Sequence, residues 1–393
     1  MHLHQILFGF ACLINTIHTF GQEGKGIYLD TSEHLIVSEW VHKEMHYTIS
    51  LPPSYKNSPA SSYPVIFLLE SDYHLHYAST TVEVMSKEGQ IPEMIIVGIP
   101  AYDNGKKYFT EDGTLSETDL MIRCNIRMND KRFLKFLEKE LLTEVNKNFR
   151  TKNYSLLVGN TQDGLLVTEA YLNNSIFHSY VAINSGFWKE ELSTIDAIDT
   201  TLTKAIKKKR FYFSGHGEVK STKNRMLDIR NNQEHLYSLL KNNGVPYSNL
   251  KFQIFEEQSN ESISLISLYH GLRFVFEDYV LPISSTITMD EVVSHYDTLS
   301  DNLGVSFLPP ENIVNMIAWT KFNNNDRKEA YKFFDLNISN YPLSHTAYEM
   351  LGYAYNNEGK KKEAIKSFEK SLRMNPNSNE RIIKLIKDLK ANK

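Results

Sequence analysis

One stretch decides how this chain folds: Leu156-Leu157-Val158-Gly159-Asn160-Thr161-Gln162-Asp163-Gly164-Leu165-Leu166. An apolar run ends at Gly159, and a helical pattern begins near Gly164. This order is typical of a nucleophile elbow, the sharp strand-to-helix turn that carries a serine in the motif G-x-S-x-G. Threonine stands at the serine position, as Thr161, and Asp163 stands at the position of the second glycine.

Apolar runs and helical patterns alternate on both sides of this turn. The apolar runs, which predict strands buried on both faces, cover residues 64–69, 94–99, 154–159, 180–183, 211–213 and 252–255. Helical patterns lie between them, over residues 77–87, 130–146, 165–172 and 226–242. Two alternating segments, residues 35–41 and 45–51, predict paired strands before the first run. Together these patterns indicate an α/β fold with a doubly wound, mostly parallel sheet.

The last part of the chain has an all-helical pattern with an internal repeat. Ala330 and Phe334 recur as Ala364 and Phe368, at the period of about 34 residues that tetratricopeptide repeats have. We expect a helical connector over residues 284–310, two repeats over 311–344 and 345–378, and a capping helix that extends to 391. Because about three repeats are usually needed to stand alone, this small all-α domain should lean on the rest of the chain.

The start of the chain predicts export. Residues 6–17 are mostly apolar and uncharged, and Thr19 and Gly21 are small residues suited to a cleavage before Gln22. We therefore expect a signal peptide over residues 1–21 and a periplasmic or secreted protein of a bacterial envelope. After that cleavage Cys124 is the only cysteine, so no internal disulfide is expected.

Composition and charge narrow the classes of partner. The chain has 393 residues, enough for two domains, and is 41% hydrophobic and 23% charged, as globular proteins are. Its net charge of −4 supplies no basic field, so we expect no nucleic-acid partner. No stretch after the signal peptide is long and apolar enough to predict a transmembrane segment in the mature chain.

With these features the chain resembles the putative-esterase (esterase D-like) group of α/β-hydrolases, fused to C-terminal tetratricopeptide repeats. The matching segments are residues 45–55, 63–72, 91–99, the elbow and 214–218, with 260–276 and 295–315 leading into the repeats. The resemblance implies an esterase-like α/β-hydrolase domain over residues 26–283. It also implies hydrolysis of carboxylic esters as the activity of the family.

The resemblance implies where a catalytic triad would stand, and this chain departs from that pattern. The nucleophile, acid and base positions fall on Thr161, Glu218 and Asn260. Glu218 fits the acid, but asparagine replaces the histidine base, and an amide takes no proton from a hydroxyl at ordinary pH. Threonine is β-branched and resists the strained backbone of an elbow. The Asp163 carboxylate is unfavourable near a developing oxyanion.

The implied cleft has six further candidate binding residues: Glu70, Asp72, Tyr73, Gln162, Trp188 and His216. His216 is also the first candidate for a substitute base, the alternative being a loop histidine with a local hydrogen bond. His74 and His76 form a His-x-His pattern, but no matching carboxylate spacing accompanies it. We therefore expect no metal and no cofactor.

Two functions remain open from the sequence. The first is a catalytically degraded esterase kept as a binding or scaffold protein, with a small ester- or sugar-like ligand in the cleft and a peptide or protein partner on the repeats. The second is an active carboxylic-ester hydrolase that uses Thr161 with Glu218 and an unidentified base. The first predicts no hydrolysis of a small activated ester, and the second predicts hydrolysis that is lost in Thr161→Ala.

Overall fold

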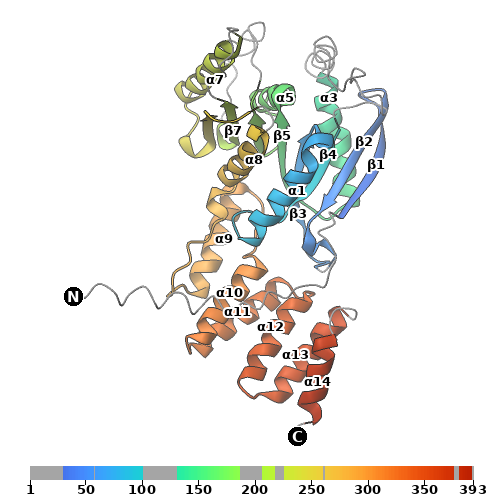
Figure 1. The fold of residues 1–393 in the computed structure, drawn as a ribbon, viewed down its shortest axis with the longest axis vertical. Helices are drawn as coiled ribbons and strands as arrows, with labels where there is room; N and C mark the ends of the chain where they lie inside the picture. The colour runs from blue at the N-terminus through green and yellow to red at the C-terminus, as the bar shows by residue number, and fades with distance from the viewer. Residues whose placement is uncertain are drawn as a thin grey trace, which may run out of the picture.

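The computed structural model describes residues 30–56, 58–100, 131–185, 206–216, 225–259, 262–375 and 380–391. The expected signal peptide, residues 1–21, and Cys124 lie outside these ranges. Figure 1 shows a sheet with helices on both sides, followed by a stack of helices that leads to the C-terminus.

Eight strands of the described chain form one sheet, in the order β1-β2-β4-β3-β5-β6-β7-β8 (Figure 1). Their bounds are β1 Asp30–Ser38, β2 Lys43–Leu51, β3 Tyr63–Leu69, β4 Ile95–Ile99, β5 Thr151–Asn160, β6 Ser179–Ile183, β7 Arg210–His216 and β8 Leu250–Phe255. The pairs β1–β2 and β2–β4 are antiparallel, whereas every pairing from β4 to β8 is parallel. The predicted mostly parallel sheet is therefore confirmed.

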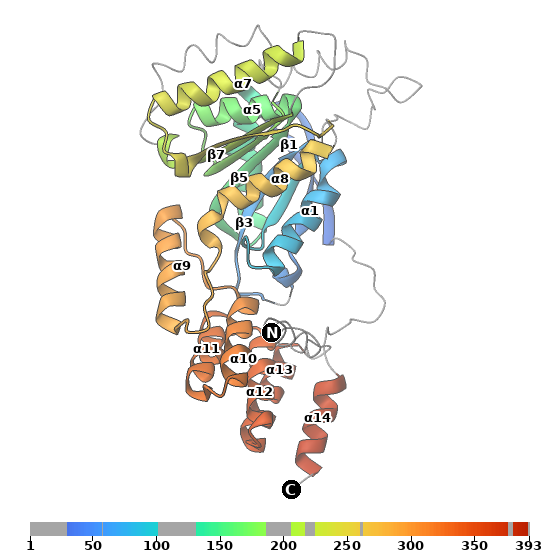
Figure 2. The same ribbon diagram turned by 60° about the vertical axis from the view of Figure 1, so that its left-hand side comes forward.

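Side chains of the central strands enter two separate cores in alternation, as the period of a strand requires. In β3, Ile66 and Leu68 enter the core beneath α1 (Ser71–Lys87) and α8 (Ser262–Val275). Val65 and Phe67 enter the core on the other face. That second face is covered by α5 (Thr161–Leu172), by α7 (Arg225–Asn242), and by a helix made of α3 (Lys131–Lys135), a π-helical turn (Phe136–Leu141) and α4 (Leu142–Asn148). Figure 2 shows α1 beside α8, and α5 beside α7 across the sheet.

The C-terminal region consists of helices that pack in pairs. Their bounds are α9 Met289–Leu303, α10 Glu311–Asn323, α11 Arg327–Asn340, α12 His345–Asn357, α13 Lys361–Met374 and α14 Glu380–Ala391. Short 3-10 turns elsewhere cover Pro53–Tyr55, Ile206–Lys208, Tyr247–Asn249 and Glu277–Tyr279. Ala330, Phe334, Ala364 and Phe368 are each 0% exposed, so the recurring residues of the repeat form its core. Within the described ranges, no helix combines the length and apolar character that crossing a bilayer takes.

Helix α10 shares its hydrophobic core with the sheet. A single cluster of buried side chains runs from Tyr279, at the end of the sheet region, through Phe307 to Val314 in α10. The Asn312 side chain adds a hydrogen bond from Nδ2 to the backbone oxygen of Lys87, at 2.7 Å. The C-terminal helices therefore pack against the hydrolase-like part of the chain through α10.

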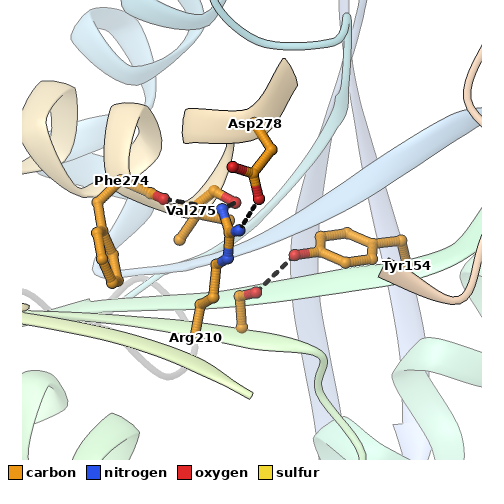
Figure 3. A network of polar contacts seen from close by, with 6 residues as sticks. Tyr154, Arg210, Phe274, Val275 and Asp278 are labelled. Carbon is orange, nitrogen blue, oxygen red and sulfur yellow. Dashed lines mark hydrogen bonds and ion pairs between the residues drawn. The ribbon is translucent and has the colours of Figure 1, made fainter. Parts of the chain in front are cut away.

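Arg210 holds the point where the chain leaves the sheet for the helical region (Figure 3). Its guanidinium donates to the backbone oxygens of Phe274 at 3.2 Å and Val275 at 2.9 Å, and it forms an ion pair with Asp278. These oxygens belong to the last turn of α8, where a cation offsets unpaired carbonyls and the negative end of the helix dipole. The contact joins the first residue of β7 to the end of α8 and the 3-10 turn that follows it.

Candidate functional site

Thr161 occupies the strand-to-helix turn that its motif predicts. It follows the last residue of β5 and is the first residue of α5, with extended Asn160 before it. Its φ angle is 48°, in the left-handed region that β-branched residues rarely enter. Such strain persists only where the surrounding structure imposes it. The chain therefore keeps the backbone of a nucleophile elbow although threonine resists that conformation.

Two glycines allow the helix of the elbow to lie close to the sheet. A Cβ atom on Gly159 would lie 2.4 Å from the backbone oxygen of Asp163, which no side chain could tolerate. A Cβ atom on Gly164 would lie 2.7 Å from Oγ of Ser185 and 2.9 Å from the backbone oxygen of Ile183. The close approach to β6 is thus made at Gly164, one residue beyond the second glycine of the motif. Asp163, at the motif position itself, is buried with 3% exposure.

Three neighbouring strands end in residues with left-handed backbone. Glu70 after β3 has a φ of 55°, and Thr161 after β5 and Asn184 after β6 both have a φ of 48°. β5 lies between β3 and β6 in the sheet, and the three strands are parallel, so these residues share one edge. Strained non-glycine residues concentrate at functional sites. This edge is therefore the candidate functional site.

A polar network links α1, the elbow and α8 at this edge. The Asn160 amide donates from Nδ2 to Oγ of Ser264 at 2.7 Å, and the same atom lies 3.4 Å from Nε2 of His74. His74 Nε2 lies 3.6 Å from Oε2 of Glu70, one helical turn earlier. Burial raises the pKa of Tyr77, a hydrogen bond with Ser264 lowers it in part, and the Glu70 carboxylate raises it further. Tyr77 therefore stays a neutral phenol beside this network.

The residues predicted to line the cleft fall into two groups. Glu70 precedes α1 in the left-handed conformation, Asp72 and Tyr73 lie exposed in the first turn of α1, and half-buried Gln162 follows Thr161. The backbone of His216 ends β7, two strands from β5 at the same edge, but its side chain is not described. The remaining predicted residues, Trp188, Glu218 and Asn260, lie outside the described ranges. The structure therefore brings Glu70 and Thr161 to one edge and leaves the acid and base positions as predictions.

Buried oxygen atoms without hydrogen-bond partners belong to residues of the elbow and of the end of β6 that it approaches. They are Oδ1 of Asn160, Oε1 of Gln162 and Oγ of Ser185, each lacking a partner in the described part of the chain. Asn160 is 7% exposed and Ser185 is 0% exposed. An ester-hydrolysing site needs donors aimed at the developing oxyanion. The three oxygens are buried acceptors with unused hydrogen-bonding capacity.

His74 is the residue that reading the sequence missed. The sequence indicates it only as part of a His-x-His pattern with His76, and the described residues contain no group of three or more potential metal ligands. The signal that identifies it is its spacing from Glu70, because residues four apart on a helix lie on one face. The imidazole nevertheless contacts Glu70 and Asn160, and among the described residues it is not hydrogen-bonded to the Thr161 hydroxyl.

Solved structures similar to this chain include two hydrolases and an uncharacterised protein. An IroE-like serine hydrolase from Shewanella oneidensis superposes with a TM-score of 0.64 at 21% identity, covering 78% of this chain and 99% of its own. An uncharacterised protein from Capnocytophaga ochracea gives a TM-score of 0.54 at 17% identity, covering 92% and 99%. The siderophore hydrolase EstA from Aspergillus nidulans gives 0.50 at 16% identity, covering 66% and 98%. At these identities the likeness shows the fold alone.

The sequence itself matches two families. The Putative esterase family matches residues 38–259, which is more than half of the chain, and a tetratricopeptide repeat matches residues 345–378. A comparison with curated proteins gives no match. The match to the first family contains the whole sheet from β2 to β8 and the elbow at Thr161. The chain belongs to the Putative esterase family and carries a tetratricopeptide repeat in its C-terminal region.

Proposed function

We propose that this chain is a catalytically degraded esterase that serves as a binding or scaffold protein outside the cytoplasm, in the periplasm or after secretion. The elbow edge would hold a small ester- or sugar-like ligand, and the repeats would hold a peptide or protein segment. Export rests on the apolar, uncharged residues 6–17 at the start of the sequence. The repeat that matches residues 345–378 supports a capacity for protein interaction.

The observation that carries this proposal is the chemistry around Thr161. The hydroxyl stands at the elbow on a strained backbone, yet the described residues give it no hydrogen-bonded base. The neighbouring Asn160 and Gln162 have buried acceptor oxygens without partners among the described residues. A hydroxyl without a base is a poor nucleophile, whereas unpaired acceptors favour a hydroxyl-bearing ligand.

Two measurements on the full-length protein test the proposal. Hydrolysis of p-nitrophenyl acetate should not exceed that of a folded control protein with similar histidine content. Thermal melting should shift upwards with at least one neutral, hydroxyl-rich probe from a panel of monosaccharides and small hydroxylated esters. The shift should shrink in Gln162→Leu, which keeps a similar volume but removes the acceptor. Hydrolysis that disappears in Thr161→Ala would overturn the proposal.

A second function is favoured by one specific contact. His74 pairs with Glu70 next to Asn160, the residue before Thr161, so a base and a carboxylate stand close to the elbow. In an active carboxylic-ester hydrolase, His74 would be the unidentified base that takes the proton of the Thr161 hydroxyl. This alternative predicts ester hydrolysis that is lost in both Thr161→Ala and His74→Ala.

A further inference from the structure

A cavity of about 350 Å³ lies at the edge of the sheet opposite to Thr161. Tyr63, the first residue of β3, and Lys152, near the start of β5, line it from the sheet. Glu311, the first residue of α10, and Tyr341, just after α11, line it from the first repeat. The volume is that of an ordinary small-molecule pocket. The cavity therefore stands at the junction of the two parts of the chain and is separate from the elbow.

Two glutamates line this cavity from opposite sides of the junction. Glu93 belongs to the segment before β4, and its carboxylate accepts hydrogen bonds from the backbone nitrogen of Ser54 at 3.3 Å and from the Ser54 hydroxyl. Glu311 accepts from the Ser344 hydroxyl at 2.7 Å. These partners are neutral, and no lysine, arginine or histidine of the described ranges forms an ion pair with either carboxylate. Charges buried without a partner are costly, so a cation in the cavity would be stabilised.

The charge of Glu93 acts on the Glu311 carboxyl group across the cavity. Burial raises the pKa of Glu93, and hydrogen bonds from Ser54 offset this in part. Burial also raises the pKa of Glu311, the Ser344 hydroxyl lowers it in part, and the charge of Glu93 raises it further. Lys87 also lines the cavity and lowers the pKa of Glu93, and its ammonium pairs with Glu83 at 2.5 Å. A ligand ammonium between the carboxyl groups would therefore favour their charged forms.

Donor groups line the same cavity. The Lys152 ammonium donates to the backbone oxygen of Ser306 and lies 5.4 Å from the centroid of the Phe307 ring. An ammonium has three donors, so this single hydrogen bond leaves capacity for an anionic group. Nδ2 of Asn340 is buried and has no partner among the described residues, and Asn340 also lines the cavity. The lining thus offers two acceptors for a cation together with two donors for an anion.

We propose that this cavity binds a small zwitterion, an amino acid or a short peptide. Its ammonium group would lie between Glu93 and Glu311, and its carboxylate would meet Lys152 and Asn340. Aromatic side chains that line the cavity, including Tyr63 and Tyr341, suit the apolar part of such a ligand, and the faces of their rings suit its ammonium group. Since Glu93 belongs to the sheet region and Glu311 to the first repeat, the ligand would hold the repeats against the hydrolase-like part.

Calorimetric titration of the full-length protein tests this site with defined probes. L-alanyl-L-alanine and the common amino acids are titrated first, and at least one should bind saturably. The N-acetyl derivative of the best probe lacks the ammonium group, and its amide lacks the carboxylate. Each derivative should bind at least about tenfold more weakly. Absence of saturable binding by every probe up to about 10 mM, or equal binding of the N-acetyl derivative, would overturn the site.

Variants connect the binding to the named carboxylates. Glu93→Gln and Glu311→Gln keep the shape and hydrogen-bonding capacity of the side chain, and each should weaken the best probe by about tenfold or more. Glu88→Gln, at an exposed position close to the cavity, is the matched control and should bind as the wild type does. If all three variants bound the best probe with equal affinity, the proposed binding of its ammonium group between Glu93 and Glu311 would be refuted. Thr161→Ala should leave this binding unchanged, which separates the cavity from the elbow.

Discussion

The Nε2 atom of His74 lies 3.4 Å from the Nδ2 atom of Asn160, the residue immediately before Thr161. The same nitrogen lies 3.6 Å from the Glu70 carboxylate, so it accepts from Asn160 when the imidazole is neutral and pairs with Glu70 when it is protonated. A histidine engaged in this way orients the asparagine of the turn. It thus supports the strained backbone at Thr161. Its alternative role is that of a base for the Thr161 hydroxyl.

Replacing His74 separates these two roles. In His74→Ala we expect a loss of about 1 kcal/mol or less in the free energy of unfolding, because the contacts it makes are long and part-exposed. Ester hydrolysis should stay at the background level of the wild type. Urea denaturation gives the first quantity and p-nitrophenyl acetate the second. His76→Ala, on the exposed side of α1, is the control. A clear hydrolytic rate in the wild type that His74→Ala abolishes would identify His74 as a base.

Gly164→Ala should destabilise the protein by about 1–3 kcal/mol, the usual cost of overpacking. The added Cβ atom would lie 2.7 Å from Oγ of Ser185 and 2.9 Å from the backbone oxygen of Ile183, and the backbone oxygen cannot turn away. The free energy of unfolding in urea measures the effect. Adding Ser185→Ala should recover only part of the loss. A neutral Gly164→Ala variant would show that α5 and β6 are not held as closely as the contact requires.

The fragment of residues 311–391 should not unfold cooperatively when produced alone. Val314 of α10 is 0% exposed because it joins the buried cluster that contains Tyr279 and Phe307. Removing the sheet region would expose this face of the first repeat, and two repeats have little core of their own. Circular dichroism during urea denaturation is the measurement. A sigmoidal transition like that of the full-length protein would show that the repeats need no support.

The junction glutamates predict how stability depends on pH. Burial raises the pKa of Glu93 and of Glu311 above the ordinary value of 4.5, so the folded state disfavours their charged forms. Their contribution to stability is therefore fully present below pH 4.5 and is lost as the pH rises through the raised pKa values. The double variant Glu93→Gln, Glu311→Gln should lack this loss. Melting temperatures of both proteins across that range test it, and parallel curves would contradict it.

Much of the fold follows from local patterns in the sequence. The apolar runs predict the parallel strands because strands buried on both faces need such runs, and the recurring Ala330 and Ala364 predict the repeat core. The predicted ends and regularity of the helices are less accurate than their number and order. The helix predicted from residue 77 begins at Ser71 in the structure. The prediction misses its start because the first turn is polar, and because the left-handed backbone of Glu70 gives no signal in the sequence. The predicted helix over 130–146 contains a π-helical turn at Phe136–Leu141, which its apolar period does not reveal.

The elbow was predictable, but its surroundings were not. Thr161 follows from the spacing of Gly159 and Gly164 after an apolar run. The contact of His74 with Asn160 depends on how α1 approaches β5, and these residues are far apart in the sequence. The cavity at the junction likewise depends on packing between α10 and the sheet. Such long-range contacts come from the tertiary structure, so a local pattern cannot specify them.

Introducing the catalytic residues of the family tests whether the elbow can gain activity. Thr161→Ser alone should change little, because the base position still holds an amide. The triple variant Thr161→Ser, Asp163→Gly, Asn260→His should gain ester hydrolysis if Glu218 supplies the acid. The rate on p-nitrophenyl acetate is the readout, with the double variant that keeps Asn260 as the control. A triple variant that is folded and still inactive would show that Glu218 does not act as the acid of the triad.

The most direct test of a non-catalytic elbow is the rate of p-nitrophenyl acetate hydrolysis by the purified wild-type protein, compared with Thr161→Ala. A site without one triad member keeps only about 10³–10⁴-fold acceleration over water in known hydrolases, and the acceptors and buried Asp163 near Thr161 should reduce even that. We predict that the two proteins hydrolyse the ester equally slowly, at the rate of a folded control protein. A robust wild-type rate that disappears in Thr161→Ala would contradict the proposal and make Thr161 a working nucleophile.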